Sequence, residues 1–99
     1  MIDKRKFYIN GQWVSPSKPN DYEVINPSTE EAFATISLGS TEDTNAAVSA
    51  AKKALVSWSE SSKDERLNLL EKLLSIYKKR YGEMADAISM EMGLSLIHI

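Results

Sequence analysis

The hydrophobic pattern of this chain changes its period at Ser40, and this change constrains the fold more than any other feature. Most turn-forming residues precede Ser40, with short stretches of aromatic and β-branched residues between them. After Ser40, alanine, leucine and aromatic side chains recur every three or four residues, which is the period of an amphipathic helix. We therefore predict an α+β fold with a β-hairpin and strand layer over residues 1–40 and a helical segment over residues 41–93.

Short extended segments are predicted in the first region, at residues 7–9, 12–14, 22–25 and 32–38. The first two flank Asn10-Gly11, a pair that tolerates the two positive φ angles of a type I′ turn, so they should form a hairpin. The third stops at Asn26-Pro27, because the residue before a proline is disfavoured in the helical region. The fourth alternates as a strand does.

Helices are predicted near residues 41–58, 62–80 and 83–92. Ser40 or Thr41 can cap the first helix, and the run from Ser62 to Glu65 has the form of a capping box for the second. Gly82 should interrupt the helical pattern before the third. The apolar stripe of the second helix consists of Leu67, Leu70, Leu73, Leu74, Tyr77 and Tyr81.

Composition argues against several classes of function. Twelve Lys and Arg face fourteen Asp and Glu, so there is no basic excess to bind nucleic acid. The absence of cysteine rules out disulfides, thiolate metal sites and a thiol nucleophile within these 99 residues. No stretch approaches the ~18 apolar residues that a membrane span needs, and no signal peptide precedes the first turn. We therefore expect a cytoplasmic protein without a membrane partner.

The order of several short motifs resembles the N-terminus of NAD(P)-dependent aldehyde dehydrogenases. The motifs are "YINGQWV", "NPSTEE", "DTNAAVSAAKKAL", "ERLNLLEKL" and "EMG", and the resemblance covers roughly residues 7–93. It implies that the chain is an α+β fragment of the α/β aldehyde dehydrogenase fold. Family members often carry glycine where Glu30 stands, so we expect that turn to be built differently here.

The resemblance also implies the chemistry of a full-length member. A cysteine thiolate attacks the aldehyde to give a thiohemiacetal, hydride passes to NAD or NADP, and a glutamate-activated water hydrolyses the thioester to the carboxylic acid. Such enzymes are homo-oligomers, either dimers or tetramers. This chain has no cysteine and no glycine pattern that binds phosphate. We therefore expect a structural segment with no catalytic, cofactor-binding or metal-binding residue, inactive by itself and binding no cofactor alone. Neither the aldehyde nor the choice between NAD and NADP follows from these residues.

Several charged residues are candidates for a functional site. His98, the only histidine, falls in the last six residues and is not expected to act as a base. Glu30-Glu31 is interpreted as a surface turn, because adjacent strand residues point to opposite faces. The basic runs at residues 4–6 and 78–80 are interpreted as solvated charge, the second of them matched to a helix dipole, in preference to anion sites.

Four further positions have structural and functional interpretations. Trp13 and Trp58 are predicted to pack in a core or against another domain, in preference to marking a binding face. Arg66, in the first turn of a helix, should pair with a later part of the full-length chain. In some members of the family, main-chain carbonyls at positions matching Val24 and Ile25 help to bind a monovalent cation, and whether they do so here is left open.

The last six residues, 94–99, read "LSLIHI" after the glycine that ends the third helix. One reading frame of a transposon-end sequencing adaptor, CTGTCTCTTATACACATC, translates to the same six residues. We interpret them as a non-native tail, and the codons in the source nucleotides would test this. The alternative is a genuine apolar C-terminal strand.

A second function remains open beside the dehydrogenase fragment. The chain could be a complete small α+β protein-interaction module without catalytic activity. A self-sufficient module should cover its own apolar helix faces, whereas a fragment should leave a large patch exposed. We accordingly predict that the isolated polypeptide is poorly soluble or molten.

Overall fold

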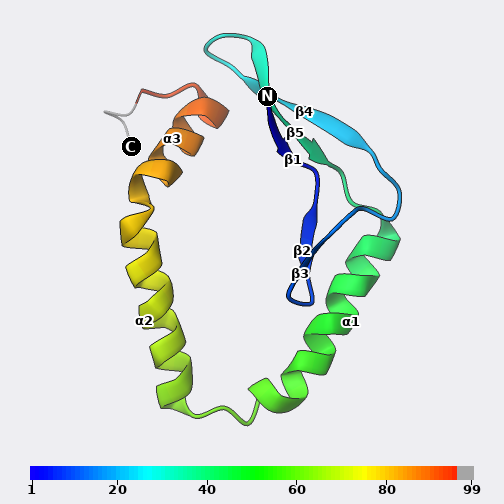
Figure 1. Cartoon of the computed structure of the whole chain (residues 1–99), viewed down its shortest axis with the longest axis vertical. Coiled ribbons are helices and arrows are strands. Elements are labelled where there is room, and N and C mark those ends of the chain that lie inside the picture. The colour runs from blue at the N-terminus through cyan, green and yellow to red at the C-terminus, as the bar shows by residue number, and fades with distance from the viewer. Residues whose placement is uncertain (96–99) are drawn as a thin grey trace.

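Strands and helices occupy separate parts of the chain in the computed structural model, which describes residues 1–95 (Figure 1). The strands are β1 (Ile2–Lys4), β2 (Phe7–Ile9), β3 (Gln12–Val14), β4 (Asp21–Asn26) and β5 (Glu31–Ser37). The helices are α1 (Thr41–Trp58), α2 (Lys63–Lys79) and α3 (Tyr81–Met92). The predicted α+β class, with strands first and three helices after them, is confirmed.

The predicted hairpin is formed by β2 and β3, which pair antiparallel from Phe7 opposite Val14 to Ile9 opposite Gln12. Both turn residues have positive φ, 54° at Asn10 and 76° at Gly11, as a type I′ turn requires. Tyr8 and Trp13 lie directly opposite each other, and their rings stack with centroids 5.1 Å apart. The Asn-Gly pair therefore sets a register that brings two aromatic rings together.

A second sheet has the strand order β1-β5-β4, with β5 antiparallel to β4 and parallel to β1. The pairing shifts by one residue between Val24, opposite Ala34, and Ile25, opposite Ala32, so Phe33 is an extra residue on β5. Strand β1 was not predicted, because three exposed residues show no alternation to detect.

The helix starts follow the capping signals. Ser40 caps α1 in a complete capping box with Asp43. At the start of α2, Ser62 Oγ accepts the Glu65 N–H at 3.1 Å without a return bond from the Ser62 N–H to the Glu65 side chain, so the capping box predicted there is half formed. The expected interruption at Gly82 is wrong. The helical path breaks instead at Arg80, with φ −103° and ψ 13°, and Gly82 lies inside α3. A Cβ at Gly82 would meet no atom within 4 Å, so no close contact requires glycine at this position.

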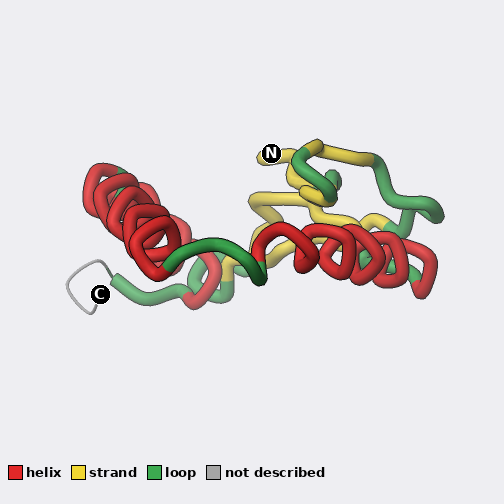
Figure 2. The backbone as a smooth tube through the Cα atoms, turned by 90° about the horizontal axis from the view of Figure 1, so that it is seen from below, coloured by secondary structure: helices red, strands yellow, loops and turns green. Residues whose placement is uncertain are grey.

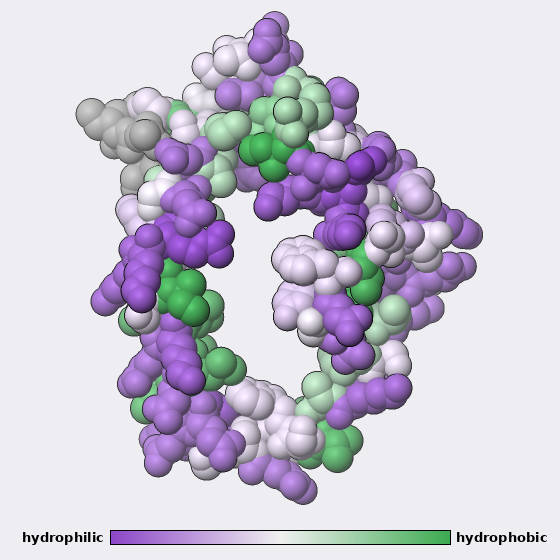
Figure 3. Space-filling view, in the orientation of Figure 1, coloured by the Kyte–Doolittle hydropathy of each residue, from purple (hydrophilic) through white to green (hydrophobic). Residues whose placement is uncertain are grey.

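Little of the described chain is shielded from water. Its buried residues are Ala34, Ser37 and Asp43. The radius of gyration is 17.2 Å, against about 13 Å for a typical compact domain of this length. The extents of 49 × 36 × 15 Å describe a plate about one helix thick, and Figure 2 shows strands beside α1 while most of α2 has no second layer over it. Figure 3 shows an open centre with hydrophobic side chains gathered along α2.

Candidate functional site

The loop after the hairpin is fastened to the start of α1 by Asp43. The carboxylate accepts the backbone N–H of Ser17 and that of Ser40, each at 3.0 Å, and the Ser40 hydroxyl at 3.1 Å. These backbone donors hold the pKa of Asp43 below its ordinary value, because they stabilise the charged form. Sequence reasoning predicted the helix cap but missed the contact with Ser17, which lies 26 residues away.

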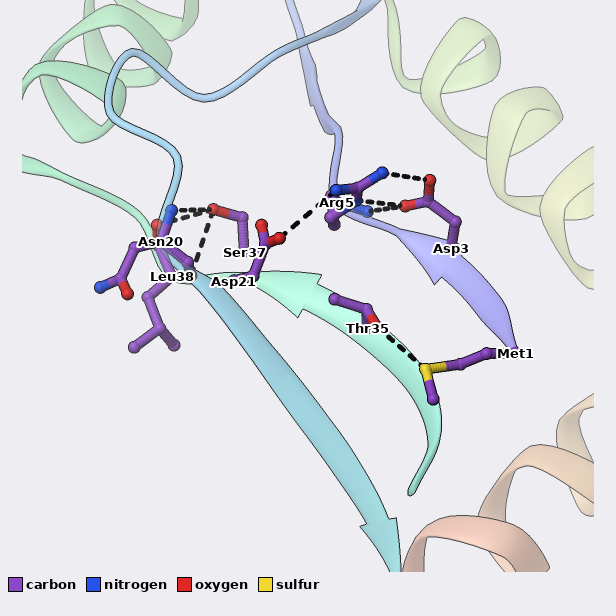
Figure 4. Close-up of polar contacts among 8 residues, drawn as sticks. All are labelled: Met1, Asp3, Arg5, Asn20, Asp21, Thr35, Ser37 and Leu38. Atoms are coloured by element: carbon purple, nitrogen blue, oxygen red, sulfur yellow. Dashed lines mark hydrogen bonds and ion pairs between the residues drawn. The ribbon is translucent and has the colours of Figure 1, made fainter. Parts of the chain in front are cut away.

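A second polar cluster links the segment after β1 to the start of β4 across the C-terminal end of β5 (Figure 4). The Arg5 guanidinium donates to both carboxylate oxygens of Asp3 at 2.9 Å and to Asp21 at 3.3 Å. This ion pair lowers the pKa of Asp3 to about 2. Arg5, in the middle of the basic run 4–6, is therefore already paired within the chain. The cluster is exposed, and the interactions it makes orient strands.

The turn after β4 approaches the end of α3 closely. Asn26 Oδ1 accepts the Ser28 N–H at 2.9 Å, and Asn26 O accepts the Glu30 N–H at 2.8 Å. Gly93 ends α3 in the left-handed conformation, with φ 69°, and a Cβ there would lie 3.0 Å from Pro27 Cγ and 3.1 Å from Ser28 N. The motifs "NPSTEE" and "EMG" thus meet in space, and only glycine meets both requirements at position 93.

Glu30 adopts the left-handed conformation in this turn, with φ 61°. Glycine adopts this conformation readily, whereas glutamate adopts it at some conformational cost. The expectation that the turn is built differently from that of family members with glycine here stays a prediction. Glu30 and Glu31 are both exposed and lie in the turn and at the start of β5, so they form no paired acid–base site.

The most extensive chemical feature is an uncovered apolar surface, called here the α2 face. Figure 3 shows hydrophobic side chains gathered along this helix. All of its members are exposed, and α2 has no buried residue. The α2 face comprises Leu67, Leu69, Leu70, Leu73, Leu74, Ile76 and Tyr77. The predicted stripe included most of these but omitted Leu69 and Ile76, which a wider count at helical spacing would have found.

Both tryptophans are open to solvent in this chain, with 67% exposure at Trp13 and 46% at Trp58. The predicted packing in a core is therefore not made by the described residues; packing against another domain stays a prediction. Arg66 Nη1 donates to the Ser61 carbonyl at 2.6 Å, in the connection between α1 and α2. The expected ion pair between Arg66 and a later part of the full-length chain stays a prediction.

The remaining candidate residues do not come together in one site within residues 1–95. Lys78 and Lys79 lie in the last turn of α2, where the helix dipole favours cations, and Arg80 pairs with Glu83 at 2.8 Å. Val24 and Ile25 lie in β4 beside the bulge. His98 lies outside the described residues, as do residues 96–99 of the tail.

Residues 1–95 contain neither a metal-binding cluster nor a membrane-spanning helix. Among them, no three or more His, Cys, Asp or Glu side chains are grouped so as to hold a metal ion. In the same residues, each helix is too short or too polar to cross a lipid bilayer.

Comparison with known proteins identifies the family. Residues 13–99 match the model of the aldehyde dehydrogenase family. The chain belongs to the aldehyde dehydrogenase family. A 3-succinoylsemialdehyde-pyridine dehydrogenase from a Pseudomonas species is 46% identical over 99 residues, which are all of this chain and 21% of that protein.

Solved structures of aldehyde dehydrogenases share the fold. An aldehyde dehydrogenase from Bartonella henselae matches with a TM-score of 0.96 and 58% identity over 97% of this chain and 20% of its own. Aldehyde dehydrogenase C from Pseudomonas syringae, in a mutant form complexed with NAD+ and octanal, matches with a TM-score of 0.91 and 39% identity over 93% of this chain and 19% of its own.

This aldehyde dehydrogenase chain therefore spans about a fifth of the length of the relatives it matches. Its short strands and three helices correspond to the N-terminal part of the aldehyde dehydrogenase fold. The motifs quoted above carry a resemblance that the comparisons confirm. The family model also covers residues 94–99, whose interpretation as a non-native tail stays a prediction.

Proposed function

We propose that residues 1–95 serve as the N-terminal structural segment of an enzyme that oxidises an aldehyde to a carboxylic acid with NAD or NADP. The observation that carries the proposal is the 58% identity and TM-score of 0.96 with a solved aldehyde dehydrogenase of which this chain covers only a fifth. The uncovered α2 face supports it, because a segment of a larger body needs such a surface and a complete domain does not.

The proposed reaction proceeds through a cysteine thiohemiacetal and a thioester, and its reacting groups lie outside this sequence. No cysteine is present to act as the nucleophile. The contribution of this chain is positional: the Asp43 and Gly93 contacts hold strands and helices in the arrangement on which the rest of the enzyme packs. By itself the chain should bind no cofactor and turn over no aldehyde.

The cofactor, assembly and location belong to the same proposal. Several structural relatives are described as complexes with NAD or NAD+, which supports a nicotinamide cofactor for the whole enzyme. A cytoplasmic homo-oligomer, dimer or tetramer, acting on a small aldehyde is the form we propose.

A chimeric enzyme tests the proposal. In the chimera, residues 1–95 of this chain replace the matching segment of the B. henselae aldehyde dehydrogenase. We expect aldehyde-dependent formation of NADH or NADPH over a panel of aldehydes that includes octanal, with kcat/KM within about tenfold of the parent enzyme. The parent enzyme and a version lacking the segment are the controls. A folded chimera without activity, beside an active parent, would contradict the proposal.

The alternative is a complete protein-interaction module without catalytic activity. The same uncovered α2 face allows it, because a partner protein could also cover that surface. The two functions differ in what the isolated chain does. A monomer that unfolds in one sharp transition would favour the module, whereas a soluble, active chimera favours the dehydrogenase.

A further inference from the structure

Asn10 differs from the other asparagines of this chain in the residue that follows it. Five asparagines occur, and Asn10 alone precedes a glycine. The other four precede larger residues and are Asn20, Asn26, Asn45 and Asn68. Because glycine has no Cβ, nothing on Gly11 shields its backbone nitrogen from the Asn10 side chain. A reaction between an asparagine side chain and the next backbone nitrogen is therefore least hindered at Asn10-Gly11.

Both reacting groups at this turn are open to solvent. Asn10 and Gly11 are exposed, and a Cβ at Gly11 would meet no atom within 4 Å. Within residues 1–95, neither the Asn10 side-chain amide nor the Gly11 N–H takes part in a hydrogen bond. By contrast, Asn45 and Asn68 lie inside α1 and α2, where the next N–H is bound within the helix. Asn26 precedes a proline, which has no N–H.

The reaction available to this pair is deamidation, and water is its only co-reactant. The Gly11 nitrogen gives up its proton and attacks Asn10 Cγ. The bond from Cγ to the amide NH2 then breaks, ammonia leaves with the added proton, and a cyclic succinimide remains. Water opens the ring at one of its two carbonyls. Breaking the bond from Cγ to nitrogen gives aspartate, whereas breaking the main-chain bond gives isoaspartate, whose backbone runs through Cβ and Cγ.

The closed β2–β3 hairpin opposes this reaction. Asn10 has φ 54°, in the left-handed region, where ψ is about +30 to +60°. This rotation turns the Gly11 nitrogen away from the Asn10 Cβ, whereas closure of the succinimide ring needs the two nearly eclipsed. The ring therefore forms only when the turn opens, and the fraction of open hairpin limits the rate.

Few contacts within residues 1–95 keep the hairpin closed. Each strand has three residues, and a two-stranded hairpin of this kind is marginally stable by itself. The stacked rings of Tyr8 and Trp13, 5.1 Å apart, are its main cross-strand contact, and both rings are exposed. Figure 1 shows the turn beside α1, and a hollow of about 370 Å³ lies between the turn and the alanine side of that helix. The hairpin thus depends largely on its own aromatic pair.

We propose that Asn10 is a site of spontaneous deamidation, and that opening of the β2–β3 hairpin sets its rate. The inference goes beyond the proposed function, because it concerns a covalent change of the chain and not the oxidation of an aldehyde. Either product adds one negative charge, so the formal net charge falls from −2 to −3.

The two products have different effects on the hairpin. Asp-Gly suits the same type I′ turn as Asn-Gly, so aspartate at position 10 keeps Tyr8 opposite Trp13. Isoaspartate adds a carbon to the backbone of the turn. Because register depends on the length of the turn, isoaspartate should separate the two rings.

Incubation of the chimera at neutral pH and physiological temperature tests the proposal. Peptide mass spectrometry measures conversion at each asparagine, and an isoaspartyl methyltransferase labels the isoaspartate product. We expect Asn10 to convert at least about tenfold faster than Asn20, Asn45 or Asn68 in the same molecule. Asn10→Gly should remove the more acidic species that ion-exchange chromatography separates. Conversion at Asn10 no faster than at the other three would overturn the proposal.

A substitution in the aromatic pair tests control by the hairpin. Trp13→Thr keeps a residue that favours strands and removes the stacking, so conversion at Asn10 should speed up by about two- to tenfold. Gln12→Thr is the matched control in the same strand, and it should change the rate by no more than about twofold. Unfolding of the chimera in urea should speed conversion at Asn10 by at least about threefold.

The other asparagines separate opening of the hairpin from general misfolding. If Trp13→Thr raises conversion at Asn10 alone, the hairpin controls the rate. A similar rise at Asn20, Asn45 and Asn68 would attribute the effect to loss of the whole fold and would overturn this control. Equal rates at Asn10 in the folded and the urea-unfolded chimera would also overturn it. Rapid conversion at Asn10 in a folded but inactive chimera would support the modification site and contradict the proposed function alone.

Discussion

The β5 strand and the α2 helix are both rich in apolar residues, yet only the strand is shielded by its own chain. Strand β5 lies between β1 and β4, and Ala34 and Ser37 on it are each 6% exposed. Helix α2 is longer and carries more large apolar side chains, and none of its residues is buried. The difference lies in the neighbours that each element finds within residues 1–95.

The comparison shows why a helix reveals a missing partner more clearly than a strand does. A strand finds its neighbours through backbone hydrogen bonds, and the β1-β5-β4 sheet supplies them locally. A helix satisfies its backbone internally, so its stability depends on covering an apolar face. The sheet and the tightly held turns should therefore tolerate isolation better than α2.

The largest effect is expected when the chain is studied alone. The isolated 99-residue polypeptide should lack a cooperative thermal transition and should bind hydrophobic dyes, because the α2 face stays exposed. Circular dichroism during heating and dye fluorescence measure this, and the chimera serves as the cooperative control. A monomer with a sharp transition would remove the contrast between the sheet and α2.

Among single substitutions where the end of α3 meets the turn after β4, Gly93→Ala should lower the unfolding free energy most. The new Cβ would lie 3.0 Å from Pro27 Cγ, and the alanine backbone would have to adopt a φ of 69°. We expect a loss of about 2–4 kcal/mol in the unfolding free energy of the chimera. Gly82→Ala is the matched control, because Gly82 lies within α3 in open space and alanine should stabilise by up to about 1 kcal/mol. Equal effects at both positions would show that the approach of α3 to the turn is unimportant.

Removing the cap of α1 should have a smaller effect. Ser40→Ala removes the hydroxyl that caps the helix and should lower the unfolding free energy of the chimera by about 1 kcal/mol. Asp43→Asn should also destabilise. The N–H groups of Ser17 and Ser40 bind different carboxylate oxygens, and the amide NH2 that replaces one oxygen cannot accept a hydrogen bond. Chemical denaturation measures both variants.

The Asp43 substitution also carries a prediction about pH. Because the folded state lowers the pKa of Asp43 below 3.8, its charge stabilises the fold above that pH. The contribution should disappear as pH falls from about 4 through the folded-state pKa. The Asn variant should lose this part of the acid dependence, and an unchanged acid profile would contradict the role given to the carboxylate.

The smallest expected effect is a gain. Glu30→Gly should stabilise the chimera by about 0.5–1 kcal/mol, because glycine relieves the left-handed strain. The greater flexibility of glycine in the unfolded chain offsets part of this gain. Asn10→Gly is the matched change, and it should gain less because asparagine tolerates φ 54°. Thermal unfolding of both variants measures the difference, and a loss at position 30 would show that the side chain contributes more than the strain removes.

The sequence predicted features that depend on neighbouring residues, such as turns and helix caps, better than contacts between residues far apart in the chain. The hairpin follows from Asn10-Gly11 and the start of α1 from Ser40 and Asp43, because turn and cap chemistry act within a few residues. Strand β1 was missed because three residues carry no period. The break at Arg80 was misplaced to Gly82, because glycine marks a weak point in a helix without dictating that it breaks there.

The contacts of the candidate site were less accessible. The approach of Gly93 to Pro27 joins motifs more than sixty residues apart, and the bond from Ser17 to Asp43 crosses 26 residues. No local rule brings such pairs together. The local partner of Arg66 was missed for a different reason, since a carbonyl five residues away leaves no charge signature in the sequence.

The 15 Å thickness of the plate has a consequence for reading natural variation in this segment. Because one helix nearly fills that depth, neighbour counts within residues 1–95 would rank Leu70 and Leu74 as harmless surface positions. Variants there would then be misjudged in any gene survey that scores this stretch separately. Tolerance at these leucines has to be judged against the whole enzyme.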